Sequence, residues 1–163
     1  EILFSTGARM RCFIHAEQPV GWYVIEGLDA EVEPLLVQPS YAAAENGSLK
    51  PDKSRHSLHQ LGYPQGTVTQ PGVGEWLYEQ PGWGEFSYTV GVKWKREEKR
   101  NVGIGSATSS LVEEEARELI DQAMERGIGA DYQTHTAGWE DFWNKASGSL
   151  PEKGIERQYC NEG

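Results

Sequence analysis

The sequence is short of cysteine, of positive charge and of long apolar runs. Two cysteines, Cys12 and Cys160, are too few for a disulfide framework, and nothing in the sequence decides whether they pair. A net charge of −10 argues against nucleic acid as a partner, because phosphate contacts need clustered Lys and Arg. No apolar run approaches the roughly 20 residues that cross a bilayer, so no membrane span is predicted.

Several signatures of catalysis and of ligand binding are also missing. No G-x-S-x-G marks a serine nucleophile, and the glycine-containing stretch GIGSAT lacks a phosphate-loop lysine. His56 and His59 form an H-x-x-H pattern, but only His15 and His135 remain to complete a metal site. We interpret His56 and His59 as exposed loop histidines, and His135 as a structural residue at the start of a helix, where it hydrogen-bonds to the backbone. The sequence predicts no metal and no cofactor.

Residues 1–109 show the period of two that is typical of β-strands. In EFSYTVGVKWK, apolar side chains from Phe86 to Trp94 alternate with polar residues and glycine, which predicts one buried and one solvated face. RNVGIGSAT follows a short charged turn and is predicted to be its hairpin partner. Cys12 alternates with apolar neighbours in ARMRCFIHA, which predicts a small buried side chain. Residues 39–74 have no sustained period and predict a long loop.

Residues 110–163 have a helical period instead. Ser110 and Glu113 form a capping box, an apolar stripe follows, and Gly127 is placed to end this first helix. The stripe comprises Val112, Ala116, Leu119, Ile120 and Ala123. A second helix is predicted from about Ala137 to Ala146, and residues 155–159 would begin a third. The predicted fold is mainly β, an antiparallel sandwich portion over 1–109, followed by two to three linker helices over 110–163.

Three large aromatic residues, Trp139, Phe142 and Trp143, share one face of the second predicted helix. They stand close to the last residue, where a free-standing domain usually frays. Both ends of the sequence look cut rather than finished, and we expect these rings to pack against protein that continues beyond the chain.

The segment from His135 to Tyr159 resembles a junction found in glycoside hydrolases and phosphorylases of families 65 and 95 and in related Bacteroidetes proteins. The matching pattern is His135, Trp139, Phe142–Trp143, Ser147, Leu150–Pro151 and Ile155–Glu156 with Tyr159. Those enzymes carry an N-terminal β-supersandwich, a helical linker and an (α/α)6 catalytic barrel. The strand pair in ARMRCFIHAEQPVGWYVIEG is also similar to strands of such sandwiches.

The resemblance implies an accessory sandwich-and-linker region that supports a catalytic barrel and borders its sugar pocket. The partners would be that barrel and an oligo- or polysaccharide, and the location extracellular or periplasmic. His135, Trp139, Phe142 and Trp143 would then pack between the domains. Because the family's catalytic carboxylates belong to the barrel, none is carried over to this chain, which we predict to be inactive alone.

Glycosidases need two carboxyl groups roughly 5–9.5 Å apart, and several acidic residues are candidates for that role. Glu75, Glu79 and Glu85 flank an aromatic turn, and Glu140–Asp141 lie on the second predicted helix. Nothing beside them would bury an acid catalyst, and we interpret them as solvated surface acids.

The turn itself carries Trp76, Tyr78 and Trp83, which predicts either local packing or a platform that stacks on sugar rings. Two alternatives to the accessory region therefore stay open. The first is a stand-alone carbohydrate-binding module that uses these three rings. The second is a structural interaction domain whose aromatic helix docks on another subunit.

Overall fold

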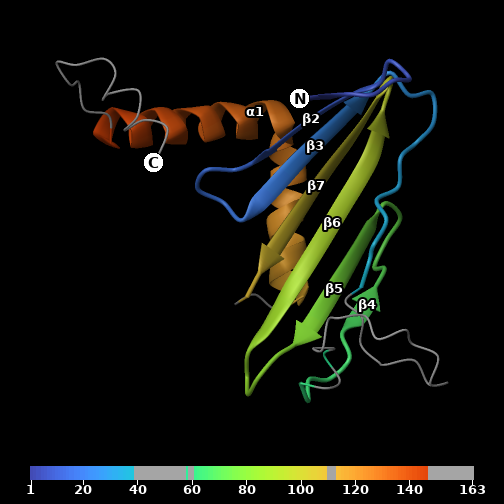
Figure 1. Ribbon diagram of the computed structural model, residues 1–163, viewed down its shortest axis with the longest axis vertical. Coiled ribbons are helices and arrows are strands. Elements are labelled where there is room, and N and C mark those ends of the chain that lie inside the picture. The colour runs from blue at the N-terminus through green and yellow to red at the C-terminus, as the bar shows by residue number, and fades with distance from the viewer. Residues whose placement is uncertain (39–57, 59–60, 110–112, 147–163) are drawn as a thin grey trace.

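The computed structural model describes residues 1–38, 58, 61–109 and 113–146, which form one antiparallel sheet and one helix (Figure 1). The seven strands lie in the order β1-β2-β3-β7-β6-β5-β4. Their bounds are β1 Ile2–Leu3, β2 Arg9–Ile14, β3 Val20–Glu26, β4 Thr67–Thr69, β5 Glu75–Pro81, β6 Ser87–Glu97 and β7 Arg100–Thr108. The helix α1 comprises Glu113–Ala146 and is bent at Gly127.

The hairpin of β6 and β7 is the centre of the sheet. Its register runs from Glu97↔Arg100 to Thr89↔Thr108, and Glu98 at the turn has a positive φ of 47°. Lys95 and Arg100 hydrogen-bond to the carboxylate of Glu97, and these bonds hold its pKa below the usual value. The predicted hairpin is confirmed.

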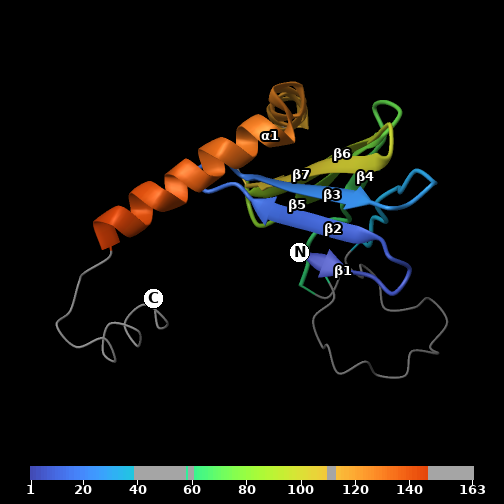
Figure 2. The same cartoon turned by 90° about the horizontal axis from the view of Figure 1, so that it is seen from above.

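Helix α1 covers a single face of the sheet (Figure 2). A row of paired residues crosses four strands on this face, Trp22, Ile104, Lys93 and Glu75. The covered face of β6 includes Thr89 and Gly91, which we predicted to be solvated. The alternation in β6 is therefore real, but its polar side faces the helix.

The core lies between α1 and the three strands β3, β7 and β6. Ala116, Ile120 and Ala123 of α1 are buried against it, as the apolar stripe predicted. The strand side chains are Val20, Trp22, Val24, Val102 and Ile104. Gly91 allows the close approach, since a Cβ there would lie 2.4 Å from Cδ1 of Ile120. Burial of each valine or isoleucine side chain in this core contributes about 1.5–3 kcal/mol to the free energy of folding.

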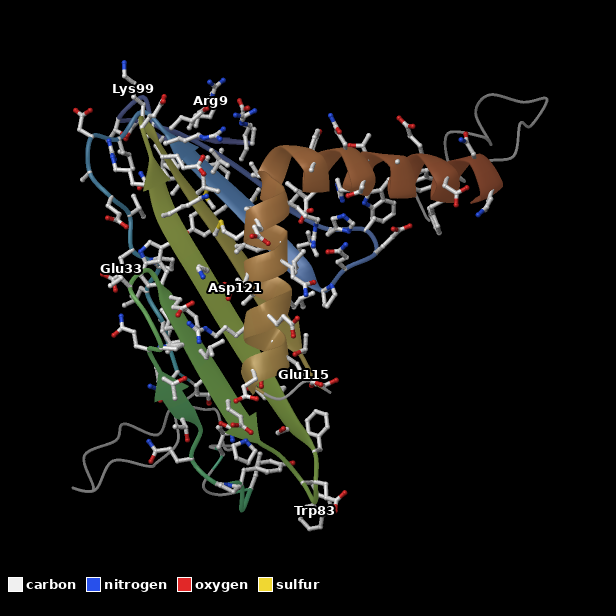
Figure 3. All side chains as sticks on the ribbon, turned by 180° about the vertical axis from the view of Figure 1, so that it is seen from behind. Arg9, Glu33, Trp83, Lys99, Glu115 and Asp121 are labelled. Carbon is white, nitrogen blue, oxygen red and sulfur yellow. The ribbon has the colours of Figure 1, made fainter. Side chains whose placement is uncertain are left out.

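Ion pairs replace apolar contacts at the β5 side of this interface. Glu75 is buried between Arg117 of α1, at 2.7 Å, and Lys93 of β6, at 3.4 Å. Asp121 of α1 contacts the same lysine (Figure 3). Burial alone would lower the pKa of Lys93, but the two carboxylates outweigh it and raise that pKa.

The opposite face of the sheet is crossed by the segment after β3. Asn101 holds this segment, because its side chain accepts a hydrogen bond from the backbone N–H of Val32 and donates one to the carbonyl of Ala30. The ring of Tyr23 lies over Gly103 on the same face, where an added Cβ would be 2.1 Å from the ring. Aromatic–glycine pairs of this kind strengthen sheets that contain glycine.

Several predictions about the fold need correction or stay open. A mainly β, antiparallel fold is confirmed, but the described residues form one helix rather than two to three, because α1 continues through the bend at Gly127. Cys12 is exposed, so the prediction of a buried thiol was wrong. The strand β4 lies within the predicted loop of residues 39–74. Ser110, Cys160 and the predicted third helix lie outside the described residues.

Candidate docking site

Helix α1 changes direction at Gly127, and its second half leaves the sheet (Figure 1). Gly127 has φ 80° and ψ 151°, a conformation that is essentially confined to glycine. The first half of α1 runs along the sheet. We call residues 128–146 the arm, and this part extends past the ends of β2 and β3 (Figure 2).

Asp131 anchors the arm to the sheet. The residue is 1% exposed, and its Oδ2 accepts a hydrogen bond of 3.0 Å from the indole Nε1–H of Trp22. Arg126 donates to Oδ1 at 2.9 Å across the bend and also reaches Gln18 in the β2–β3 turn, at 2.7 Å. A buried carboxylate is tolerated only when it is paired and hydrogen-bonded, and both conditions hold here.

His15 provides a second anchor one turn further along the arm. Its Nδ1 accepts hydrogen bonds from the backbone N–H groups of Glu17 and Gln18. The ring proton is therefore assigned to Nε2, which donates to Oγ1 of Thr134 at 2.8 Å. The hydroxyl of Thr134 in turn donates to the carbonyl of Asp131 at 3.1 Å.

Gly138 brings the arm close to the same turn. A Cβ at Gly138 would lie 3.1 Å from Cβ of Ala16, which is tighter than most contacts between side chains. The hydrogen bonds of Asp131 and His15, together with this contact, fix the arm at three successive levels of its helix.

Aromatic rings line one face of the arm. We call this set the aromatic stripe; it consists of Tyr132, His135, Trp139, Phe142 and Trp143. The row of ring contacts begins at Phe13 of β2, whose ring centroid lies 5.3 Å from that of Tyr132. It extends along the arm to Trp139 and Phe142, whose ring centroids are 5.6 Å apart. Spacings of three and four residues place the rings in one row along a helix.

The stripe is largely uncovered by the described residues. Tyr132, Trp139, Phe142 and Trp143 are 43–55% exposed. The four residues that we predicted to pack between domains, His135, Trp139, Phe142 and Trp143, do lie together on this face, and their interdomain role stays a prediction.

His135 differs from expectation in its contacts. We predicted a position at the start of a helix and a hydrogen bond to the backbone. The residue instead lies inside α1, where its ring centroid is 4.9 Å from that of Phe13 and 6.4 Å from that of Trp139. Its Nδ1 is buried and finds no hydrogen-bond partner among the described residues.

The three rings that we predicted to bind sugar are not brought together. Tyr78 is only 4% exposed, and its hydroxyl bonds to Gln80. Trp83 is 82% exposed at the tip of the β5–β6 turn (Figure 3). Trp76 lies on the face opposite α1, where it lines a hollow of about 440 Å³ together with Glu33 and Gln70.

The acidic residues that were candidates for catalysis lie in ion pairs or on the surface. Glu75 is buried and forms ion pairs with Lys93 and Arg117, so the interpretation of this residue as a solvated acid was wrong. Glu79 and Glu85 are exposed, as interpreted. Glu140 is exposed, and Asp141 pairs with Lys145 on the arm surface. No cluster of metal-binding side chains occurs in the described part of the chain, and His56 and His59 lie outside it.

The residues that anchor the arm were missed by the sequence reasoning. Asp131 stands eight residues after Ala123, on the continuation of the apolar stripe of α1. A single acid in such a position is a signal of a buried polar contact, although its partner Trp22 lies 109 residues away and has no signature in the sequence.

Comparison with known proteins gives no indication of the function. No protein-family model, curated protein or solved structure matches the chain. Within the described residues, no helix is long and apolar enough to cross a membrane. The functional conclusion therefore depends on the arm and its aromatic stripe.

Proposed function

We propose that this chain is the non-catalytic accessory region of a glycoside hydrolase, in which a sheet and a linker helix support a separate catalytic barrel. The observation that carries the proposal is the aromatic stripe, whose Trp139, Phe142 and Trp143 are 43–52% exposed. Contiguous exposed aromatic surface marks interaction sites, and each ring can bury about 150–250 Å² when a partner covers it.

The position of the stripe supports a docking role over a role in the chain's own core. The core residues of α1 precede Gly127, whereas the stripe follows it, on the part of the helix that leaves the sheet (Figure 1). The resemblance of the same segment to the linker of barrel enzymes supplies the partner, an (α/α)6 barrel. A second sheet that completes a sandwich, action on an oligo- or polysaccharide and a location outside the cytoplasm belong to the same proposal.

The gene that encodes the chain is the first test. The proposal expects the reading frame to continue beyond residue 163 into repeated α-helical hairpins with a pair of acidic residues facing a common cavity. A frame that ends without such a region would refute the accessory role.

The second test compares variants in that longer protein. Replacing Phe142 and Trp143 together by Ser should lower the melting temperature of the barrel and its hydrolysis of aryl glycosides. Asn144→Ser is the control, because Asn144 is also exposed on the arm but lies outside the aromatic stripe. Equal effects of the two changes would contradict docking through the stripe. Glycoside hydrolysis by residues 1–163 alone, lost on Glu75→Gln, would contradict the non-catalytic role.

Carbohydrate binding by the chain itself is the second candidate. It is favoured by the 82% exposure of Trp83 and by the hollow of about 440 Å³ in which Trp76 meets Gln70 and Glu33. Titration against a panel of glycans separates the two surfaces. Binding lost on Trp83→Ala assigns the turn, binding lost on Trp76→Ala assigns the hollow, and no binding to any glycan removes this candidate.

A further inference from the structure

The turn between β2 and β3 holds α1 at two points, and one of the two contacts is made by a titratable side chain. His15 is 5% exposed, and its Nε2 lies 2.8 Å from Oγ1 of Thr134 in the arm. Gln18 accepts a hydrogen bond of 2.7 Å from Arg126 beside the bend. We call residues 15–18 the latch. Because both contacts come from one short turn, any change that opens the turn loosens both of them.

The latch requires a neutral imidazole. Nδ1 of His15 accepts hydrogen bonds from the backbone N–H groups of Glu17 at 3.1 Å and of Gln18 at 3.2 Å. A protonated imidazole carries a hydrogen on both ring nitrogens and accepts at neither. Protonation would therefore remove two hydrogen bonds and point a third N–H group at the two that are already there. The turn has to open to relieve this conflict.

The charged groups around His15 oppose one another. On the arm, Asp131 is negative but is already paired with Arg126 at 2.9 Å, and the ring centroid of His135 lies 6.2 Å from that of His15. Glu17 in the turn is exposed, so water and salt screen its charge, and the start of β3 contributes only apolar residues and glycine. Neither sign of charge prevails, and the two hydrogen bonds to Nδ1 therefore decide the effect of protonation.

The arm depends on the latch beyond Thr134. Isolated helices shorter than about 12–15 residues are marginal in water, and residues 134–146 form a helical segment of that size. Trp139, Phe142 and Trp143 of the aromatic stripe all belong to this segment. When the latch opens, Asp131 remains as the polar anchor, and the segment that carries most of the stripe is no longer fixed.

We propose that the latch is a pH-dependent switch, which holds the arm while His15 is neutral and loosens residues 134–146 when His15 is protonated. Histidine changes its charge between about pH 5 and 8. Since the loosened state accepts the proton without losing hydrogen bonds, the anchored state is stable at neutral pH and is weakened as the pH falls through this range. The inference rests on the proposed docking role only for its use, which is to present the stripe at neutral pH.

Hydrogen exchange in residues 1–163, without any partner, measures the switch directly. Protection factors, corrected for the intrinsic effect of pH on exchange, are compared at pH 7.5 and pH 5. The amides of Trp139, Phe142 and Trp143 should lose about tenfold or more of their protection at pH 5. The amide of Ile120, in the half of α1 that packs on the sheet, should stay within about threefold.

Two variants identify the group that titrates. In His15→Asn, the side-chain oxygen accepts backbone N–H groups two to three residues on and does not titrate, so the arm should exchange at the same corrected rate at both pH values. His135→Gln is the control, because it removes the neighbouring imidazole, keeps a good helix former and leaves the latch intact. This variant should retain the pH dependence of the wild type.

Three results would overturn the proposal: equal protection of the wild-type arm at both pH values, an undiminished pH dependence in His15→Asn, and its loss in His135→Gln. If His15→Asn does not fold, the ring nitrogens of His15 in the wild type decide, since their NMR titration should share its midpoint with the loosening of the arm. Separate midpoints would exclude His15 as the switch. Docking through the stripe is tested at constant pH in the longer protein, so either proposal can fail without the other.

Discussion

Replacing Gly127 by Ala tests whether the bend in α1 is imposed by backbone conformation. An alanine at φ 80° and ψ 151° is strained, at a cost of about 1–3 kcal/mol. An added Cβ meets nothing within 4 Å, so no side-chain clash contributes to the change. The lower conformational entropy of alanine in the unfolded chain offsets about 0.4–1 kcal/mol of this strain. We therefore expect the free energy of unfolding to fall by about 1–2 kcal/mol.

Gly129→Ala is the matched control, two residues further along the same helix. Gly129 also has nothing within 4 Å of an added Cβ, but its φ is not positive. Alanine there should raise the free energy of unfolding by about 0.5–1 kcal/mol.

Urea unfolding, followed by tryptophan fluorescence, measures both variants. If Gly127→Ala instead straightens α1, Asp131 moves away from Trp22 and stability falls as well. An increase in stability for Gly127→Ala, equal to that of Gly129→Ala, would refute a conformational origin of the bend.

Three further substitutions test the sheet and the anchor, each by urea unfolding. Asp131→Asn should cost about 2–3 kcal/mol, because it removes a buried charge that accepts three hydrogen bonds, whereas Asp141→Asn on the exposed arm surface should stay within about 0.5 kcal/mol. Burial raises the pKa of Tyr23 to about 12 and its hydroxyl has no partner among the described residues, so Tyr23→Phe should add about 1 kcal/mol at pH 7. Wild type should also lose stability between pH 10 and 12, where Tyr23 deprotonates first in the unfolded state, and this loss should be smaller in Tyr23→Phe. Gly91→Ala should cost about 1–3 kcal/mol by overpacking the helix against the sheet.

The central hairpin and the first half of α1 could be predicted because their signals are local. The strict alternation in β6, the short charged turn and β7 follow one another within residues 87–108. Ala116, Ile120 and Ala123 repeat at helical spacing, and all three are buried. Gly127 was also recognised as a break, and its non-helical φ and ψ do interrupt the helical backbone there, although α1 resumes directly afterwards in a new direction.

The choice of the covered sheet face could not be predicted from alternation alone. Tyr88, Val90 and Val92 form the more apolar side of β6, yet they are only half-buried. Helix α1 covers the side with Gly91 and Lys93, because the glycine admits Ile120 and the lysine finds carboxylates on both β5 and α1. Both reasons depend on residues that are distant in the sequence.

Four residues of the aromatic stripe, His135, Trp139, Phe142 and Trp143, could be predicted as a set because they lie within nine positions of one another, whereas Tyr132 was missed. The proposed sugar platform was less predictable, because Trp76, Tyr78 and Trp83 belong to a strand and to its turn. Tyr78 is buried, and Trp83 lies at the tip beyond the paired residues. Closeness in the sequence brings rings together on a helix face more reliably than at a hairpin end.

The chemistry of the anchor indicates that the arm presents its stripe in a fixed direction. Apolar contacts alone would hold a helix against the sheet without specifying its angle, since they are not directional. Asp131 instead requires the indole N–H of Trp22 and the guanidinium of Arg126 at hydrogen-bond distance, and His15 requires Thr134. A pivot of the arm would leave this carboxylate buried without its partners, at a cost of several kcal/mol. A surface that is held rigidly before binding loses little entropy when a partner covers it, which is the physical advantage of anchoring a docking helix by buried polar groups.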